Sequence, residues 1–347
     1  MAHAGRIAES YSPVVFTQPD GLNDDDVTET LLRGWGLVAD NVGYAALGFG
    51  SHHWHAVAGD TQWFVTVDDL DSRRQHVADT RLRARQRLNA ALSGAYALQR
   101  QGRSFVVAPV PSGAGSVLEN VDERYVLALY PHIEGRAGSW GRYDTQAERF
   151  AVIDRLIDIH RATETVKGVV GVDDFGVPSR DQLTCALDET SSPWPTGPYA
   201  ERTRTLLARH SRDLNAALSR HDDLVVLVRN RRSDPVVTHG EPHRGNVIFT
   251  PEGASLIDWD TTLLAPHERD LWSLIDEDPE TGAYYTSKSG RPVDADALRL
   301  YRLWWDLCEI SLYVAEFHSP HIDSVDTRTA WQGLEKYLDP RRWVEAN

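Results

Sequence analysis

Cysteine is scarce in this sequence, which has only Cys185 and Cys308 in 347 residues. Two isolated thiols provide neither a disulfide framework nor a thiolate metal site, and they fit a reducing cytoplasm. Long apolar runs are also absent, so no segment is expected to span a membrane. The first residues, MAHAGRIAESYSPVVF, lack the basic start and the apolar block of a signal peptide. Together these absences predict a cytoplasmic chain.

Positive charge is in short supply as well. The sequence has 36 Lys and Arg residues against 51 Asp and Glu residues, which gives a formal net charge of -15. This balance argues against nucleic acid as a partner, because such binding depends on Lys and Arg. It favours a small cationic partner, whose encounter an acidic surface accelerates. An acidic surface also simply keeps proteins in solution, so net charge leaves both interpretations open.

The stretch over residues 236–260, VVTHGEPHRGNVIFTPEGASLIDWD, carries most of the chemistry. A β-rich run, a polar loop, a turn and a second apolar run predict a hairpin with polar groups at one end. Glu241, Asn246 and Asp258 would then lie close together. Carboxylate and amide oxygens suit a hard cation such as Mg²⁺, usually shared with phosphates, and a further carboxylate could orient a substrate hydroxyl. An ordinary hairpin rich in polar turn residues is the alternative.

The order and spacing of these residues resemble the catalytic loop and metal-binding Asp of the kinase fold. This form of the motif is most similar to the aminoglycoside phosphotransferase family and its choline-kinase-like relatives. The resemblance implies that Glu241 is the catalytic base and that Asn246 and Asp258 hold Mg²⁺. It also implies that His239 braces the loop and that Arg244 belongs to the catalytic loop.

Glu241 is a departure from the family, which usually has Asp at this position. The extra methylene extends the reach of the carboxylate by about 1–1.5 Å. A misplacement of about 1 Å can cost about a hundredfold in rate, so either the loop is set back or the chemistry is altered. After the motif, Asp260 is a candidate for metal or substrate contact, and Asp270 is expected to anchor the segment that follows.

The resemblance implies an α+β, two-lobed protein-kinase-like fold, with a nucleotide-binding lobe over residues 1–131 and a helical lobe over 132–347. Length and composition agree, because 347 residues suffice for about two lobes and 41% apolar with 25% charged residues is ordinary for globular proteins. In the first lobe, sequence patterns predict helices over 24–35 and 76–101 and strands over 42–49, 54–57, 62–67, 105–110 and 125–130. In the second lobe they predict helices over 145–163, 199–220, 298–317 and 327–337.

Two segments resemble the nucleotide-binding parts of the family. One is the turn around Gly48 and Gly50, where glycines let backbone N–H groups approach phosphate closely, although a plain β-turn is the alternative. The other is YPHIEG at residues 130–135, which resembles the hinge whose main chain binds adenine. The resemblance thus implies contacts with ATP or GTP at Gly48, Gly50, Ser51, His53, Leu129 and Tyr130.

One charged pair of the family is missing. Alignment of the strand QWFVTV puts Thr66 where family members have a Lys that binds the nucleotide phosphates, and the helix predicted over 76–101 contains no Glu to hold such a Lys. The two absences are consistent with each other, because loss of both the Lys and its Glu partner leaves no unpaired charge behind. The phosphate charge must then be met by Mg²⁺ or by other cations, of which the candidates are His52, His53, Arg81, Arg83, Arg85 and Arg244.

The resemblance implies transfer of a phosphoryl group from ATP or GTP, with Mg²⁺, to a hydroxyl of a small cationic molecule such as an aminoglycoside or aminocyclitol antibiotic. The missing Lys and the Glu at the base position leave open a pseudokinase without turnover, and a kinase of a metabolite such as choline, homoserine or a sugar is the other alternative. Neither nucleic acid nor a membrane is expected as a partner. Acids in the expected substrate region, each of which could also be a solvated surface group, are Glu277, Asp278, Glu280, Glu309 and Glu316.

Overall fold

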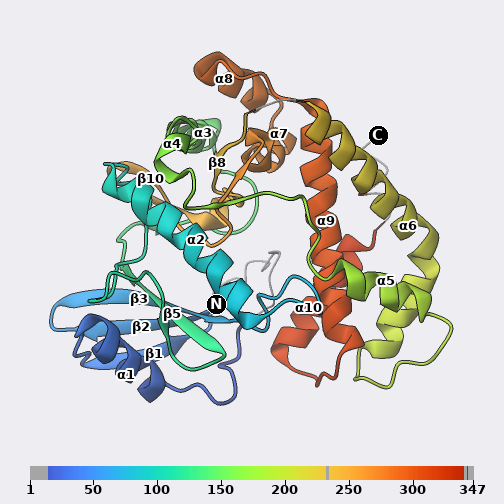
Figure 1. Cartoon of the computed structure of the whole chain (residues 1–347), viewed down its shortest axis with the longest axis horizontal. Coiled ribbons are helices and arrows are strands. Elements are labelled where there is room, and N and C mark those ends of the chain that lie inside the picture. The colour runs from blue at the N-terminus through green and yellow to red at the C-terminus, as the bar shows by residue number, and fades with distance from the viewer. Residues whose placement is uncertain (1–14, 232–233, 340–341, 343–347) are drawn as a thin grey trace.

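The chain folds into a β-sheet lobe and a larger, mainly helical part (Figure 1). The computed structural model describes residues 15–231, 234–339 and 342. Most of the segment that lacks signal-peptide features, residues 1–14, lies outside these ranges. Among the described residues, no helix is both long and apolar enough to cross a membrane. The α+β class predicted from the sequence is confirmed.

Five antiparallel strands form the sheet of the first lobe, in the order β1-β2-β3-β5-β4. Residues such as Val65 and Leu129 are buried on one face, against helix α1 (Asp24–Trp35). Because successive side chains of a strand alternate, their neighbours Thr66 and Ala128 point to the other face. The strands are β1 Asn41–Ala45, β2 His52–Ala58, β3 Thr61–Asp69, β4 Glu119–Asn120 and β5 Tyr125–Pro131.

Both long helices of this lobe begin at a side-chain cap. Asn23 forms a reciprocal capping box at the start of α1, and the predicted bounds of this helix are confirmed. Helix α2 (Arg81–Arg100) begins after its cap Thr80, later than the predicted start at residue 76. The residues between β3 and α2 therefore form a loop, and one residue of this loop lies at the candidate active site.

The segment over residues 105–110, predicted as a strand of the first sheet, is not one. The N–H of Leu256 donates to the carbonyl of Phe105 (2.7 Å), and the N–H of Val107 donates to the carbonyl of Leu256 (3.0 Å). The segment therefore pairs with the hairpin of β9 (Val247–Thr250) and β10 (Gly253–Leu256), and β4 takes the edge of the sheet instead.

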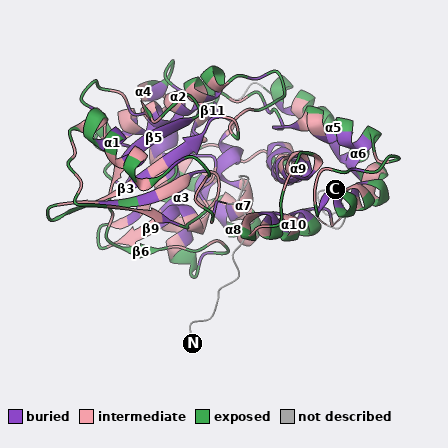
Figure 2. Cartoon of the chain, turned by 90° about the horizontal axis from the view of Figure 1, so that it is seen from below, coloured by how far each residue is buried: buried purple, intermediate pink, exposed green. Residues whose placement is uncertain are grey.

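Helix α9 runs through the centre of the helical part, and most of its residues are buried (Figure 2). It packs against α5, α6, α7 and α10. The four long helices predicted from the sequence are confirmed, although α6 continues well beyond its predicted end. The helices are α3 Gln146–Arg161, α4 Thr163–Val166, α5 Arg180–Asp188, α6 Ala200–Asn230, α7 Trp272–Glu277, α8 Glu280–Ser289, α9 Ala295–His318 and α10 Val325–Tyr337.

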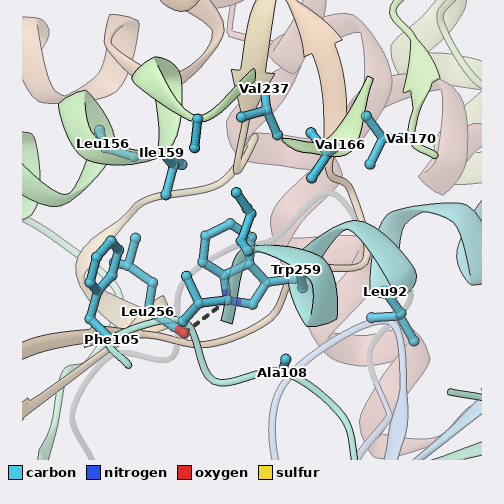
Figure 3. Close-up of a cluster of buried hydrophobic side chains, with 14 of the residues drawn as sticks. Leu92, Phe105, Ala108, Leu156, Ile159, Val166, Val170, Val237, Leu256 and Trp259 are labelled. Carbon is cyan, nitrogen blue, oxygen red and sulfur yellow. Dashed lines mark hydrogen bonds between the residues drawn. The ribbon is translucent and has the colours of Figure 1, made fainter. Parts of the chain in front are cut away.

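Two three-stranded sheets carry the catalytic motif. The first joins β6 (Arg136–Ala137) to the β9–β10 hairpin, and the second has the order β7-β11-β8, with bounds Gly171–Val172, Leu263–Ala265 and Val236–Thr238. Trp259 lies in the hydrophobic cluster beside them and donates through Nε1 to the carbonyl of Leu256 at 2.9 Å (Figure 3). Because Trp259 is fully buried, the acids on either side of it are held in place.

Candidate active site

The loop after β8 is fixed by the carboxylate of Asp270. Its oxygens accept the backbone N–H of His239 (3.0 Å) and of Gly240 (2.6 Å), and they contact Nε2 of His160 (2.9 Å). Burial opposes the ionisation of Asp270, but His160, His239 and the N–H of Gly240 together outweigh it and lower the pKa of Asp270. Gly240 must be glycine here, because its φ is 101° and a Cβ would lie 2.4 Å from Nη1 of Arg269.

His239 holds the loop from the inside. Its Nε2 donates to the carbonyl of Ile257 (2.9 Å), and its Nδ1 accepts the N–H of Glu241 (3.2 Å). Burial lowers the pKa of His239, and the neutral ring is the form that donates at one nitrogen and accepts at the other. These contacts agree with the predicted bracing role. The backbone of Glu241 is thereby fixed, while its carboxylate, 10% exposed, lies 3.8 Å from Nε2 of His243.

Asn246 is oriented through its amide nitrogen. Nδ2 donates to the carbonyl of Glu241 (3.1 Å), and the main chain of Asn246 is tied to His243 (2.9 Å) and Ile257 (3.1 Å). No described residue donates a hydrogen bond to the amide oxygen. This oxygen is therefore available as a ligand for a hard cation.

Asp258 follows β10 in a left-handed conformation, with φ 65°, which is rare for a residue with a side chain. It is exposed at the surface, and the protein around it removes only part of its hydration. This desolvation, together with the charges of Asp260 and Glu241, raises the pKa of Asp258 well above its usual range. A carboxylate that is short of positive neighbours favours a bound cation.

Asn246 and Asp258 fit the predicted magnesium site. In the part of the chain that the structure describes, no three His, Cys, Asp or Glu side chains are grouped to hold a metal ion. A dense cluster is not required, because Mg²⁺ in phosphotransferases is bound through one or two carboxylates and completes its coordination with waters and substrate phosphates. The amide oxygen of Asn246 and the carboxylate of Asp258 are donors of the kinds that such a site uses.

The face of the first sheet opposite α1, here called the inner face, is where a nucleotide is expected. His53, Thr66 and Ala128 lie side by side on it, across β2, β3 and β5. Asp68 follows Thr66 by two residues along β3 and therefore points the same way. Ser51, just before β2, donates from Oγ to Asp68 (2.8 Å). The predicted nucleotide residues Ser51 and His53 thus share this face with Asp68.

Tyr130 also lies on the inner face, because it is two residues beyond Ala128 on β5. Burial raises the pKa of its hydroxyl, and the negative charges of Asp68 and Asp258 add to this effect. Leu129 does not share the face. Its side chain is buried on the α1 side, and its carbonyl accepts the N–H of Val110 (2.7 Å), so the predicted contact between Leu129 and the nucleotide receives no support.

The glycine turn between β1 and β2 has the backbone that the sequence suggested. Gly48 and Gly50 have φ values of 70° and 83°, in the left-handed region that favours glycine. Nδ1 of His53 contacts the carbonyl of Leu47 (2.9 Å) and so supports this turn from the first strand after it. The role of His53 is therefore compatible with shaping the turn.

Most of the cations proposed for the phosphates are uncharged or engaged elsewhere. Burial lowers the pKa of His52, and it lowers the pKa of His53 to about 4, so both rings are neutral near pH 7. Arg81 forms two hydrogen bonds with Asp71 (2.8 and 2.7 Å). Arg85 turns to the edge strand β4, where it donates to a side chain at 3.0 Å.

Arg244 is in the catalytic loop, but its guanidinium turns towards the segment that follows β6. It donates to Oγ of Ser139 (3.1 Å) and pairs with Asp144. The same segment comes so close at Gly138 that a Cβ there would lie 1.8 Å from the carbonyl oxygen of Arg244. These contacts fit a role in fastening the loop better than the predicted catalytic role. Arg83, the remaining candidate, is exposed on α2.

Arg73 is the cation on the inner face, and sequence reasoning missed it. Its Nε and Nη2 donate to Oδ1 of Asp68 (3.0 and 2.6 Å), and Nη2 lies 2.5 Å from Oδ2 of Asp260. Arg73 belongs to the loop between β3 and α2 and to no recognisable motif. The only signal for it was the acidic run DDLD at residues 68–71, one residue before it.

A group of aromatic rings lies on the other side of the catalytic loop. The ring centroid of Trp140 is 3.9 Å from that of His243 and 5.9 Å from that of Trp305, and Trp272 is 5.8 Å from Trp305. One helical turn after Trp305, Glu309 is fully buried, and neither of its oxygens has a well-formed hydrogen bond among the described residues, although the hydroxyl of Tyr313 is close enough to offset part of the cost of its burial. Burial raises the pKa of Glu309 well above its usual range, and the nearby charge of Glu241 contributes.

Comparison with known proteins agrees with this arrangement. A sequence profile of the phosphotransferase enzyme family matches residues 48–309, from the glycine turn to Glu309. Protein StrN of Streptomyces griseus is 29% identical over 273 residues, which cover 74% of this chain and 80% of that protein.

Solved structures share the fold at low sequence identity. Spectinomycin phosphotransferase in complex with ADP and spectinomycin superposes with a TM-score of 0.71 at 16% identity, covering 94% of this chain and 98% of that chain. An amicoumacin kinase gives a TM-score of 0.57 at 13% identity, covering 92% and 94%. Choline kinase LicA from Streptococcus pneumoniae gives 0.54 at 14% identity, covering 90% and 98%. The kinase-like fold is thus confirmed, and the chain belongs to the phosphotransferase enzyme family, whose members transfer phosphoryl groups to hydroxyl acceptors.

Proposed function

We propose that this enzyme transfers the γ-phosphoryl group of ATP, with Mg²⁺, to a hydroxyl of a small cationic molecule such as an aminoglycoside or aminocyclitol antibiotic. The observation that carries the proposal is the position of Glu241. Its backbone is fixed by His239 and its carbonyl orients Asn246, while its carboxylate is within the electrostatic reach of both Asp258 and Glu309. This supports a role for Glu241 between the proposed metal ligands and the proposed acceptor site.

The chemistry asked of each residue is modest. Phosphoryl transfer proceeds through a loose transition state, so catalysis consists mainly of positioning and charge stabilisation. Glu241 accepts a hydrogen bond from the substrate hydroxyl and takes its proton late in the reaction, for which an ordinary carboxylate suffices. The amide oxygen of Asn246 and the carboxylate of Asp258 would hold Mg²⁺, which neutralises charge on the phosphates when bound.

Glu309 supports the cationic nature of the acceptor. A charged carboxylate is costly to bury, and apart from Tyr313 little around Glu309 offsets this cost. A positively charged group of the substrate would stabilise its ionised form. The rings of Trp140, Trp272 and Trp305 lie beside the catalytic loop, where aromatic faces attract cations. The net charge of -15 adds a long-range attraction for such a molecule.

The ligands and activities of structural relatives point to the same class of acceptor. One was solved with ADP and spectinomycin, and another is an amicoumacin kinase solved with AMP-PNP and Ca²⁺. Choline and aminopropanol kinases share the fold too, so a cellular amino alcohol is the second candidate acceptor.

The direct test is a product-mass screen. The purified protein with Mg²⁺ and ATP, and in parallel with GTP, is incubated with a panel of aminoglycosides, aminocyclitols, choline, homoserine and sugars. We expect one class of cationic alcohols to gain the mass of a single phosphoryl group. Phosphorylation of neutral sugars alone would contradict the cationic acceptor, and nucleotide binding without any product would favour the pseudokinase.

Substitution of Glu309 tests the substrate side of the site. We expect Glu309→Gln to raise KM for the cationic acceptor about 10- to 100-fold, because a hydrogen bond to a buried charge contributes about 1.5–3 kcal/mol, while KM for ATP stays within about twofold. Steady-state kinetics with each substrate varied in turn measure both values.

A matched control lies on the same helix. Asp296 is in the first turn of α9, about 20 Å along the helix axis from Glu309, and it pairs with Arg299 and Arg231 at the surface. Asp296→Asn is expected to leave both KM values unchanged. An unaltered acceptor KM in Glu309→Gln would remove Glu309 from the substrate site.

A further inference from the structure

This enzyme has no positive charge at the position where family members have a phosphate-binding Lys. Thr66 lies at the centre of the inner face, opposite Ala128 and His53, and carries no charge. Helix α2 has no Glu that could have held a Lys there. The nucleotide phosphates nevertheless carry several negative charges, and they would approach a region that already contains Asp258, Asp260 and Glu241.

Arg73 fills this gap from a different part of the chain. Its partner Asp68 is two residues beyond Thr66 on the same face of β3, so the guanidinium is held over that face. Arg73 is always charged at physiological pH. Asp68 is almost fully buried and holds Arg73 in the way that a helix Glu holds the Lys in kinases.

The contacts of Arg73 also place it between the two segments that phosphates must bridge. Its Nη2 lies 3.1 Å from Oγ of Ser51, next to the glycine turn, and 2.5 Å from Asp260, next to the proposed metal ligand Asp258. No described residue accepts a hydrogen bond from Nη1, and the side chain remains 19% exposed. A guanidinium so placed has free donors for a phosphate oxygen.

The backbone of Arg73 is fixed as well. Its N–H donates to the carbonyl of Asp69 (3.1 Å), and its own carbonyl accepts from Nη2 of Arg87 (3.0 Å). The loop that carries it is tied to the helical part, because the N–H of Ser179 donates to the carbonyl of Gln75 (2.7 Å). An arginine on a loop anchored at both ends is preorganised for binding.

We propose that Arg73, held by Asp68, binds the phosphates of the nucleotide and replaces the lysine that is absent at Thr66. The inference rests on the proposed use of ATP. The alternative is that Arg73 only clasps the sheet to the helical part through Asp260. The two differ in their consequences, because a clasp acts on the whole site whereas a phosphate ligand distinguishes ATP from adenosine.

The test is a comparison of affinities. ATP, ADP and adenosine are titrated calorimetrically into the wild type and Arg73→Met, each with Mg²⁺. We expect the substitution to weaken ATP binding about 10- to 100-fold, as for loss of a charged hydrogen bond, with adenosine within about twofold. Arg81→Met is the matched control, since Arg81 is 42% exposed and pairs with Asp71 near the end of the same loop; it should bind ATP as the wild type does.

Arg73→Lys controls for a folding defect in Arg73→Met, because it keeps a positive charge beside Asp68 and Asp260. Lys lacks the forked donors of Arg, so we expect ATP to bind about 3- to 10-fold more weakly and adenosine to bind normally. Wild-type ATP affinity in either Arg73 variant, or an equal loss for ATP and adenosine, would overturn the proposal. A wild type that does not bind ATP would instead overturn the proposed function from which the inference starts.

Discussion

Glu241→Gln is expected to lower kcat about 10²- to 10⁴-fold, the range typical for loss of a general base. Gln has the same size as Glu and keeps the backbone contacts with His239 and Asn246, so the loop should stay in place. The dissociation constant of ATP is expected to remain within about twofold. Stopped-assay kinetics with the acceptor identified by the mass screen, together with calorimetric titration of ATP, measure the two quantities.

Glu241→Asp tests whether the loop is adapted to the longer side chain. The carboxylate would be withdrawn by about 1 Å, and a displacement of that size can cost about a hundredfold. We therefore expect a loss of about 10- to 100-fold in kcat, although Asp is the usual residue of the family. An Asp variant faster than the wild type would show that the loop geometry is not adapted to Glu241.

Glu252 provides the control for both substitutions. It is exposed in the turn between β9 and β10 of the same hairpin, and Glu252→Gln should change neither kcat nor ATP affinity. If Glu241→Gln retained more than a tenth of the wild-type kcat, the assignment of Glu241 as the base would have to be abandoned.

The parts of the fold that local sequence determines were predicted well. Helix α1 was placed at its observed bounds because Asn23 and the acidic first turn mark its start. The segment over residues 105–110 was misassigned because its apolar run says only that it is buried. Which strand it pairs with depends on Leu256, about 150 residues later, and a local pattern does not contain that information.

The residues of the candidate site likewise fall into those that local sequence predicts and those that it does not. His239, Glu241, Asn246 and Asp258 lie within twenty residues of one another, so their spacing alone suggested a shared site. Arg73 reaches this site through Asp260, nearly 190 residues away in sequence. The sequence analysis did identify the missing charge at Thr66, but the replacement comes from an irregular loop for which no spacing rule exists.

Asp258 and Asp260 differ in their electrostatic environment. Desolvation opposes the ionisation of Asp260, but its ion pair with Arg73 and its contact with Asp258 hold its pKa low. For Asp258, desolvation and the charges of Asp260 and Glu241 outweigh the weaker effect of Arg73 and raise the pKa. Two neighbouring carboxylates thus have different electrostatic surroundings. Asp260 is paired with a protein cation, which agrees with the proposal that Asp258 is the residue that holds the metal ion.

The largest effect on stability is expected for Asp270→Asn. Asp270 is fully buried and is the shared acceptor for His239, Gly240 and His160. Removing its charge leaves these donors without an anionic partner, and breaking a buried pair in this way costs about 3–5 kcal/mol. Because Asp270 positions the catalytic loop and does not touch the substrate, kcat should also fall, by about 10- to 100-fold, with little change in the KM for ATP.

Asp173→Asn is the matched control. Asp173 also accepts two hydrogen bonds, from the N–H of Phe175 and the hydroxyl of Tyr301, both at 2.8 Å, but it does not contact the catalytic loop. It should lower the free energy of unfolding and leave kcat of the folded enzyme unchanged. Denaturant titrations and kinetics on both variants separate the positioning role of Asp270 from simple loss of stability, and an unchanged kcat in Asp270→Asn would refute that role.

The effect of Asp270→Asn should depend on pH in a defined direction. In spite of burial, His160, His239 and the N–H of Gly240 together hold the folded-state pKa of Asp270 below the ordinary value of 3.8. A carboxylate with a lowered pKa stabilises the folded chain fully above its unfolded pKa, and this contribution is lost as the pH falls through the folded-state pKa. The difference in unfolding free energy between the wild type and Asp270→Asn should therefore be constant from neutral pH down to about pH 5 and shrink below about pH 4. A difference that grew on acidification would mean that the donors around Asp270, and not its charge, determine the stability of the loop.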